Sequence, residues 1–193
     1  TATSPVRWRS FLRTIWPDDG TAIDCLQEVF GYFLSGATDQ QKLFCVIGPK
    51  RSGKGTIARV VTALLGKDDV AGPTLASFAT NFGLQSLIGR RLAIIGDARL
   101  RGQQTDIAER LLSISGEDTL TVDRKNQTAW VGRLPARILL LSNETPSLLD
   151  ASGALASRFV LLRMTRSWYG KEDPDFKIND VDHTLYGDIT NAE

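Results

Sequence analysis

Hydrophobic residues near the start of the chain recur at the spacing of a helix face. The first set stands at i, i+3, i+4 and i+7 and consists of Trp8, Phe11, Leu12 and Ile15. Pro17 ends this pattern, and a second helical pattern runs from Ile23 to Leu34 and closes near Gly36. Residues 1–36 are therefore predicted to form a helical segment that packs on the rest of the chain.

Short apolar runs come next, and they predict buried strands. These runs cover residues 43–47, 92–97, 138–141 and 159–162. Helical patterns lie between some of them, one ending at Gly66 and one over residues 104–115. Buried strands that alternate with helices are typical of an α/β fold with a mainly parallel central sheet flanked by helices.

A polar tip separates two strand-like stretches, Thr119–Asp123 and Thr128–Val131, which predicts a β-hairpin inserted before the strand at 138–141. Residues 67–90 are ambiguous, because only a short helix is indicated there, by Leu84, Leu87 and Ile88. After Met164 the chain turns polar and acidic. We therefore predict a core over 37–166 and a polar arm over 167–193.

Composition places the chain among soluble globular proteins. Its 193 residues suit one domain, and 42% are hydrophobic and 23% charged. No apolar run is long enough for a transmembrane helix, and no leader pattern opens the chain. The chain begins at Thr1 and its one methionine is Met164, so we expect a piece of a longer protein.

Charge and cysteine content add two expectations. A net charge of +1 gives no overall field that favours nucleic acid, so any such binding must come from local clusters. Cys25 and Cys45 lie in apolar patterns and form no disulfide framework, which favours a reducing, cytoplasmic location. His183 stands alone in the polar tail, so no zinc site is expected.

Between the first apolar strand and the helix that ends at Gly66 lies a glycine-rich loop with a lysine. It reads Gly48, Pro49, Lys50, Arg51, Ser52, Gly53, Lys54, Gly55 and Thr56. Strand, glycine loop, lysine and helix form the arrangement that holds nucleotide phosphates. Gly48 and Gly53 let backbone N–H groups turn inward, and Lys54 reaches the β- and γ-phosphates. The alternative is a glycine-rich turn before an ordinary helix.

The loop departs from the common pattern G-x-x-x-x-G-K-[ST] at one position. Gly55 follows Lys54, and the hydroxyl comes one residue later, at Thr56. This shift matters because Mg²⁺ requires oxygen ligands in near-octahedral geometry. Nucleoside monophosphate kinases also carry G-K-G-T, so the variant is compatible with a phosphate site.

Three polar residues at the ends of predicted strands complete the candidate site. Asp97 ends a buried strand and is suited to hold Mg²⁺, although a surface aspartate is the alternative. Asn143 follows a second buried strand and is suited to contact the γ-phosphate or the attacking water, unless it is an ordinary turn asparagine. Arg158 precedes the last strand, where it either stabilises a neighbouring subunit's transition state or caps and salt-bridges locally.

These motifs, in this order, resemble a superfamily 3 helicase, an AAA+-related P-loop ATPase. The most similar group is the helicase domain of the phage and plasmid primase family, related to the poxvirus primase-helicase. The matching segments are residues 48–56, 91–99, 109–118, 123–125, 142–146 and 157–159. The resemblance implies that Lys54 and Thr56 belong to Walker A, Asp97 to Walker B and Asn143 to motif C, and that Arg158 is the arginine finger.

The resemblance also implies an assembly and a partner. Such proteins form rings, usually hexamers, with ATP and Mg²⁺ at subunit interfaces and single-stranded DNA through the centre, next to a primase domain. The hairpin then points into the channel and offers Arg124, Lys125 and Asn126 near its tip, with Trp130 on its second strand. The alternative is a solvated hairpin with a packing tryptophan.

One further departure leaves the function open between hypotheses. Relatives often carry a second acidic residue after the Walker B aspartate, where this chain has Ala98. Asp97 then serves both tasks, or another carboxylate reaches the water, or turnover is slow; the candidates are Glu109, Glu117 and Glu144. A ring-forming DNA helicase is the main hypothesis. The alternatives are a monomeric nucleotide-kinase-like phosphotransferase and a non-hydrolysing ATP-binding switch or DNA clamp.

Overall fold

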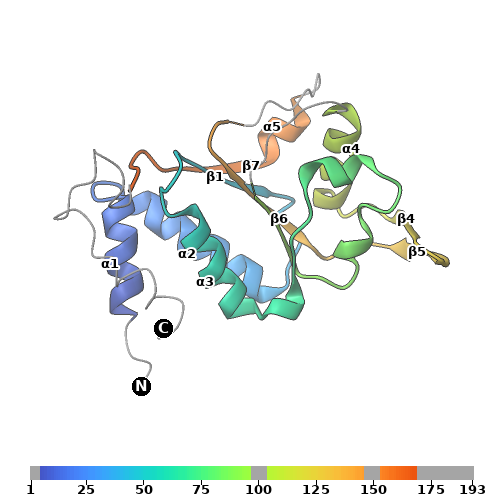
Figure 1. The fold of residues 1–193 in the computed structure, drawn as a ribbon, viewed down its shortest axis with the longest axis horizontal. Helices are drawn as coiled ribbons and strands as arrows, with labels where there is room; N and C mark the ends of the chain where they lie inside the picture. The colour runs from blue at the N-terminus through green and yellow to red at the C-terminus, as the bar shows by residue number, and fades with distance from the viewer. Residues whose placement is uncertain (1–4, 97–103, 146–152, 169–193) are drawn as a thin grey trace.

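A computed structural model describes residues 5–96, 104–145 and 153–168 of the chain (Figure 1). Its helices are α1 (Val6–Ile15), α2 (Gly20–Ser35), α3 (Lys54–Leu65), α4 (Gln104–Ser115) and α5 (Ala154–Arg158). Its strands are β1 (Leu43–Ile47), β2 (Val70–Ala71), β3 (Leu92–Ile95), β4 (Leu120–Arg124), β5 (Gln127–Gly132), β6 (Arg137–Ser142) and β7 (Phe159–Arg163). Short 3₁₀ helices cover Lys67–Asp69, Leu75–Ala79 and Gln85–Leu87.

Five strands form one parallel sheet in the order β2-β3-β6-β1-β7. In the sheet, β6 lies between β1 and β3, although it follows both of them in the chain. Every residue of β1 and β6 is buried, as expected of central strands covered on both faces. The carboxyl ends of β1, β3 and β6 therefore meet at one edge of the sheet, which we call the carboxyl edge; the opposite edge is the amino edge.

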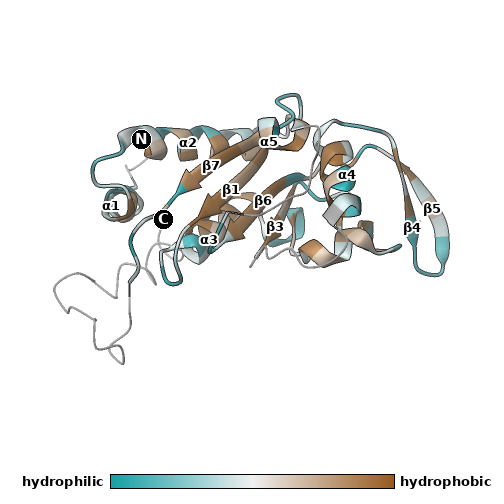
Figure 2. Cartoon of the chain, turned by 90° about the horizontal axis from the view of Figure 1, so that it is seen from above, coloured by the Kyte–Doolittle hydropathy of each residue, from teal (hydrophilic) through white to brown (hydrophobic). Residues whose placement is uncertain are grey.

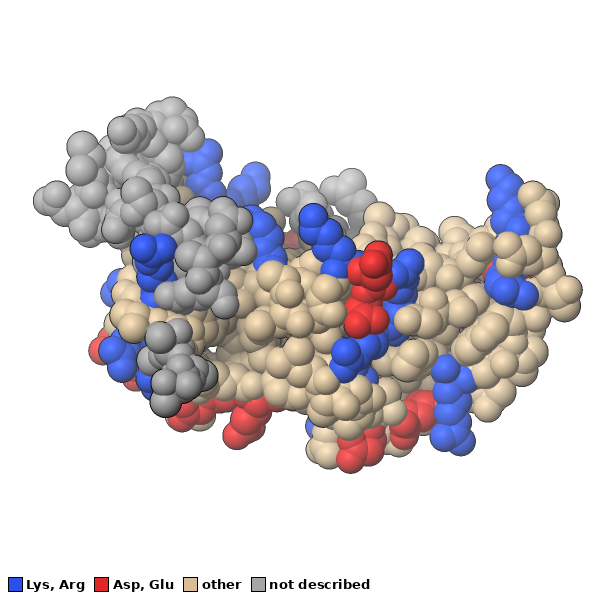
Figure 3. All heavy atoms as spheres, turned by 90° about the horizontal axis from the view of Figure 1, so that it is seen from below, with Lys and Arg blue, Asp and Glu red and all other residues tan. Residues whose placement is uncertain are grey.

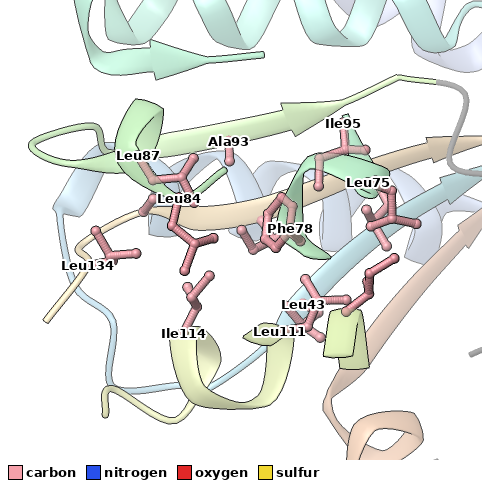
Figure 4. Packing of buried hydrophobic residues seen from close by; sticks show 14 of the residues in the cluster. Leu43, Leu75, Phe78, Leu84, Leu87, Ala93, Ile95, Leu111, Ile114 and Leu134 are labelled. Atoms are coloured by element: carbon pink, nitrogen blue, oxygen red, sulfur yellow. The ribbon is translucent and has the colours of Figure 1, made fainter. Parts of the chain in front are cut away.

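Alternate residues of the strands belong to two different core clusters. The strands of the central sheet are coloured mainly as hydrophobic in Figure 2. Phe44 and Val46 face a cluster built with α1, α2 and α3. Leu43 and Cys45 belong to the other cluster, to which α4 and the 3₁₀ helices Leu75–Ala79 and Gln85–Leu87 contribute. Figure 4 shows Leu43 among these residues. A period of two along each strand thus supplies apolar side chains to both layers of the fold.

The hairpin is a separate two-stranded antiparallel sheet of β4 and β5. It extends from the end of the molecule far from α1 (Figure 1). Val122 is buried and ties β4 to the core. Because α4 precedes the hairpin and Arg137 at the start of β6 follows it, the hairpin is connected to the amino edge of the sheet.

The α/β fold, the parallel sheet, the two N-terminal helices and the hairpin confirm the sequence-based predictions. Among the described residues, the missed elements are the 3₁₀ helices Lys67–Asp69 and Leu75–Ala79, the strand β2 and the helix α5. β2 has only two residues, which is too short to show a strand pattern. α5 has five residues and ends at Arg158, so this arginine closes a short helix directly before β7.

Candidate phosphate-binding site

The glycine-rich loop connects the carboxyl end of β1 to the start of α3. Two residues take positive φ angles there, Arg51 at 59° and Gly53 at 98°. Gly53 is the N-cap of α3, and the helix begins at Lys54 with no acidic residue in its first turn. The positive end of the α3 dipole therefore faces the loop without a carboxylate of its own to neutralise it.

Lys54 turns its ammonium group back into the loop. Its Nζ donates to the carbonyl oxygens of Gly48 at 2.6 Å and Pro49 at 2.7 Å, and to Ser52 Oγ at 3.2 Å. These partners are neutral, whereas a phosphate oxygen offers a charge-assisted bond about twice as strong. The lysine is thus placed to exchange loop carbonyls for an anion.

Close packing explains two of the loop's glycines, Gly48 and Gly53. A Cβ on Gly48 would stand 2.7 Å from Met164 Cβ, closer than real Cβ atoms approach. A Cβ on Gly53 would stand 3.0 Å from Phe11 Cζ of α1, at a φ that side chains rarely adopt. The loop is therefore held between α1 and the chain that leaves β7.

The segment after β7 also fixes the orientation of the loop peptides. The Ser167 hydroxyl donates to the carbonyl of Lys50, and the Trp168 N–H donates to the carbonyl of Arg51 at 2.9 Å. In a trans peptide the N–H points opposite to the carbonyl. The N–H groups of Arg51 and Ser52 therefore point away from this segment, as in a concavity that binds anions.

The hydroxyl of Thr56 is already engaged. Nη2 of Arg59 donates to Thr56 Oγ1 at 3.0 Å, and Thr56 is only 4% exposed. A divalent cation on this oxygen would lie against a guanidinium of like charge. With Arg59 in place, Thr56 is therefore poorly suited to act as a magnesium ligand. The described residues contain no cluster of three or more His, Cys, Asp or Glu side chains that could hold a metal ion.

Asn143 is brought next to the loop. It follows Ser142, the last residue of β6, whose carbonyl accepts the N–H of Gly48 at 3.1 Å. The side chain of Asn143 is exposed at the carboxyl edge. Asp97 lies outside the described residues, as do Ala98 and Pro146; the strand that precedes Asp97, β3, ends at Ile95 beside β6.

Arg158 lies at the other edge of the sheet. The next residue, Phe159, pairs with Leu43 at the start of β1, so the length of a five-residue strand, about 16 Å, separates Arg158 from its own loop. Its Nη1 donates to the carbonyl of Leu112 and to Ser115 Oγ, both at 2.7 Å. Within its own chain, Arg158 therefore caps the carboxyl end of α4, as the capping alternative anticipated.

The three carboxylates that could act on water are also separated by the fold. Glu117 accepts a hydrogen bond from the hydroxyl of Thr38, which precedes β1, so Glu117 belongs to the amino edge. Glu109 is exposed on α4. Glu144 follows β6 at the carboxyl edge, and its N–H donates to Ser142 Oγ at 3.3 Å. Of these three, Glu144 is the one nearest in the chain to the loop contact at Ser142.

At the hairpin tip the backbone is fixed by side chains. Nε of Arg124 donates to the carbonyl of Thr128 at 2.8 Å, and the N–H of Lys125 donates to Gln85 Oε1 at 3.1 Å. Asn126 adopts a φ of 59° in the turn. Lys and Arg side chains stand at this end of the molecule (Figure 3). Trp130 is partly buried and packs against the core.

Sequence reasoning missed two arginines. Arg59 gave no signal beyond its position one turn into α3. Arg137 is 4% exposed and donates to the carbonyls of Ala37 at 2.7 Å and Phe33 at 3.1 Å, near the end of α2. Burial lowers the pKa of its guanidinium, and the ring of Tyr32 lies 5.6 Å away. The one sequence signal for this role was that an arginine stands directly before the apolar run of β6.

Comparisons with known proteins agree with this fold. A family model described as "Family of unknown function (DUF5906)" matches residues 46–158, which include the loop, Asn143 and Arg158. The apo structure of the C-terminal region of NrS-1 (305–718) matches with a TM-score of 0.73 at 14% identity, covering 98% of this chain and 45% of that one.

A JCV helicase structure matches with a TM-score of 0.58 at 18% identity, over 83% of this chain and 45% of that chain. A second JCV helicase structure gives 0.56 at 16%, over 86% and 46%. At these identities the likeness shows the fold alone, an α/β fold with a parallel central sheet that this chain shares with a JCV helicase and the NrS-1 C-terminal region. The chain spans less than half the length of these neighbours. None of the described helices is long and apolar enough to cross a membrane.

Proposed function

Because the chain belongs to DUF5906, a family of unknown function, its activity must be inferred from its own site, and we propose an ATP-driven helicase or translocase on single-stranded DNA. The observation that carries the proposal is the position of Lys54 in the glycine-rich loop. Lys54 lies at the positive end of α3 among loop carbonyls, on a fold shared with a JCV helicase. Such a loop is suited to a triphosphate.

In this proposal the phosphates replace the carbonyls of Gly48 and Pro49 as partners of Lys54. Asn143, held beside the loop through Ser142, contacts the γ-phosphate or positions the attacking water. Asp97 and Glu144 are the candidates for activating that water. Mg²⁺ stays in the proposal as the ion that Asp97 would hold, and no step depends on it.

Arg158 supports an ATP site shared between subunits. It lies about a strand length from its own loop, so it cannot stabilise a transition state there. In a closed ring, the amino edge of one subunit faces the next subunit's site, and Arg158 then supplies the stabilising charge. The ring is proposed as a hexamer, as in the family that the sequence resembles.

The hairpin is the proposed DNA contact. Arg124 and Lys125 stand near a turn whose backbone is fixed, which lowers the entropy lost when phosphates bind. A primase domain elsewhere in the same protein, and a role in phage or plasmid replication in the host cytoplasm, belong to the same proposal.

A second candidate is a switch that binds ATP without hydrolysing it. Two observations favour it: Ala98 stands where relatives carry an acid, and Arg59 holds the Thr56 hydroxyl. The two functions differ in turnover and not in binding.

The test is ATP hydrolysis per subunit, measured over a range of protein concentrations with and without single-stranded DNA. A ring motor should show a rate that climbs with both. A flat rate indifferent to DNA would contradict the proposal and support a monomeric phosphotransferase. ATP binding without turnover at any concentration would support the switch.

A further inference from the structure

The guanidinium of Arg59 lies beside the position at which a phosphate loop usually presents its metal-binding hydroxyl. That hydroxyl belongs to the residue directly after the lysine, which here is Gly55. A Cβ built on Gly55 meets Arg59 Nη1 at 3.6 Å, the nearest contact found. The other terminal nitrogen, Nη2, donates to Thr56 Oγ1 at 3.0 Å. One side chain therefore covers both positions at which a hydroxyl could serve a metal.

The first turn of α3 carries no acidic residue that could balance the positive charges of Lys54 and Arg59. Lys54 opens this helix, the guanidinium of Arg59 reaches back to Thr56 in its first turn, and that turn contains no Asp or Glu. Cations at this end of a helix dipole are disfavoured, whereas anions are favoured. Two cations here are compatible with an anion that bridges them and are poorly suited to a divalent cation beside them.

Accessibility separates Arg59 from the structural arginines of the chain. Arg137 is buried and binds helix carbonyls, whereas the side chain of Arg59 is exposed. It lines a groove of about 710 Å³ between α3 and the outermost strand, β2, with Ile94 of β3 in its wall. An exposed guanidinium can rotate from a hydroxyl to a phosphate, whose oxygens fit its planar fork.

We propose that Arg59 is a second phosphate-binding cation of the loop and that it takes over the charge which a hydroxyl-bound Mg²⁺ supplies in ordinary phosphate loops. The inference rests on the proposed ATP site. Its consequence is a site that binds a nucleoside triphosphate with little dependence on magnesium.

The test measures the dissociation constant of a fluorescent ATP analogue twice, with excess Mg²⁺ and with EDTA. For the wild-type protein the two constants should agree within about fivefold, because Arg59 serves the phosphates in either buffer. Arg59→Ala should weaken metal-free binding by about tenfold or more and weaken binding with Mg²⁺ much less. Arg59→Lys, which keeps the charge but loses the fork, should fall between them.

Lys67→Ala is the matched control. Lys67 lines the same groove and carries the same charge, but it lies beyond the other end of α3, so its removal should leave both constants unchanged. Thermal melts should show that both variants are folded, since both side chains are exposed.

A double variant tests directly whether a hydroxyl with bound Mg²⁺ can replace Arg59. Adding Gly55→Ser to Arg59→Ala restores the common pattern and should recover affinity only when Mg²⁺ is present. Recovery that ignores the metal would overturn the inference, as would an Arg59→Ala variant that loses affinity equally in both buffers or in neither. A folded wild-type protein that binds no ATP in either buffer would overturn the proposed function itself, and this inference with it.

Discussion

The two edges of the sheet use their cations differently. At the amino edge, arginines donate to carbonyls in the last turns of helices: Arg137 to Phe33, Arg91 to Leu34 and Arg158 to Leu112. These helix ends leave carbonyls without intrahelical partners and carry the negative end of the dipole. Cation and helix end therefore stabilise one another, and the protein itself supplies every partner named.

At the carboxyl edge the match is reversed. Lys54 opens α3 at its positive end, where a cation is disfavoured by about 0.3–1 kcal/mol, and the guanidinium of Arg59 reaches back to Thr56 in the first turn. The hydrogen bonds described above join these two cations to neutral carbonyls and hydroxyls. The comparison teaches that charge alone does not mark a site, because its position relative to the helices matters too. The cations of the amino edge meet the negative ends of helices, whereas Lys54 lies at the positive end of a helix, where an anion is favoured.

The strongest test of this contrast is Lys54→Ala. It should abolish ATP binding and hydrolysis, because the loop loses the ammonium that its carbonyls hold ready for phosphate. Isothermal titration with ATP and a steady-state hydrolysis assay measure both effects. Lys67→Ala, at the far end of α3, is the control and should bind ATP normally; a Lys54→Ala protein that still turned over ATP would remove the phosphate site from the loop.

Arg158→Ala tests whether an amino-edge arginine also has a partner outside its own chain. In the assembled protein it should lower turnover by about a thousandfold and spare ATP binding. A capping role alone would instead lower the free energy of unfolding by about 1 kcal/mol, through the lost bond to Leu112, and leave turnover intact.

Mixing two inactive variants separates these roles. A Lys54→Ala subunit keeps Arg158, and an Arg158→Ala subunit keeps its loop, so their shared interface holds one complete site. Hydrolysis should return when the two proteins are mixed. Mixtures that stay inactive at every ratio, with assembly shown by light scattering, would argue against an arginine acting across subunits.

The layout of the fold followed from the sequence because its signals are local and strong. A five-residue apolar run such as Leu43–Ile47 can only be a buried strand beside a glycine loop, and Gly36 and Gly66 mark helix ends through their own backbone conformations. The loop's chemistry was predictable for the same reason, since Gly48 to Thr56 are consecutive.

The contacts made by the arginines were not predictable, because each depends on residues far away in the chain. Arg137 meets Ala37 and Arg158 meets Leu112, pairs that no spacing rule connects. Arg59 is local to Thr56, yet a motif pattern records which residues occur and not which hydroxyl is already bonded. The separation of Glu117 from the loop likewise became visible only through its contact with Thr38.

Arg137→Met tests whether this amino-edge arginine serves stability alone. The carbonyls of Phe33 and Ala37 lose their donors, and the ring of Tyr32 loses a cation, so the protein should be destabilised by about 2 kcal/mol. Urea denaturation measures this. ATP affinity of the folded variant should not change, because the residue lies at the edge opposite the loop; a large loss of affinity would break the division between the two edges.

The hairpin is the exception at the amino edge, because its basic residues project from the sheet and not onto helix ends. Replacing Arg124 and Lys125 with alanine should weaken binding of single-stranded DNA by about tenfold and reduce the slope of log affinity against log salt by about 1.4. Fluorescence anisotropy over a salt series measures both quantities. Asn126→Ala, which removes no charge, should leave the slope unchanged and cost only the strain of its turn, where φ is 59°. An unchanged slope in the double variant would move the DNA contact away from the hairpin.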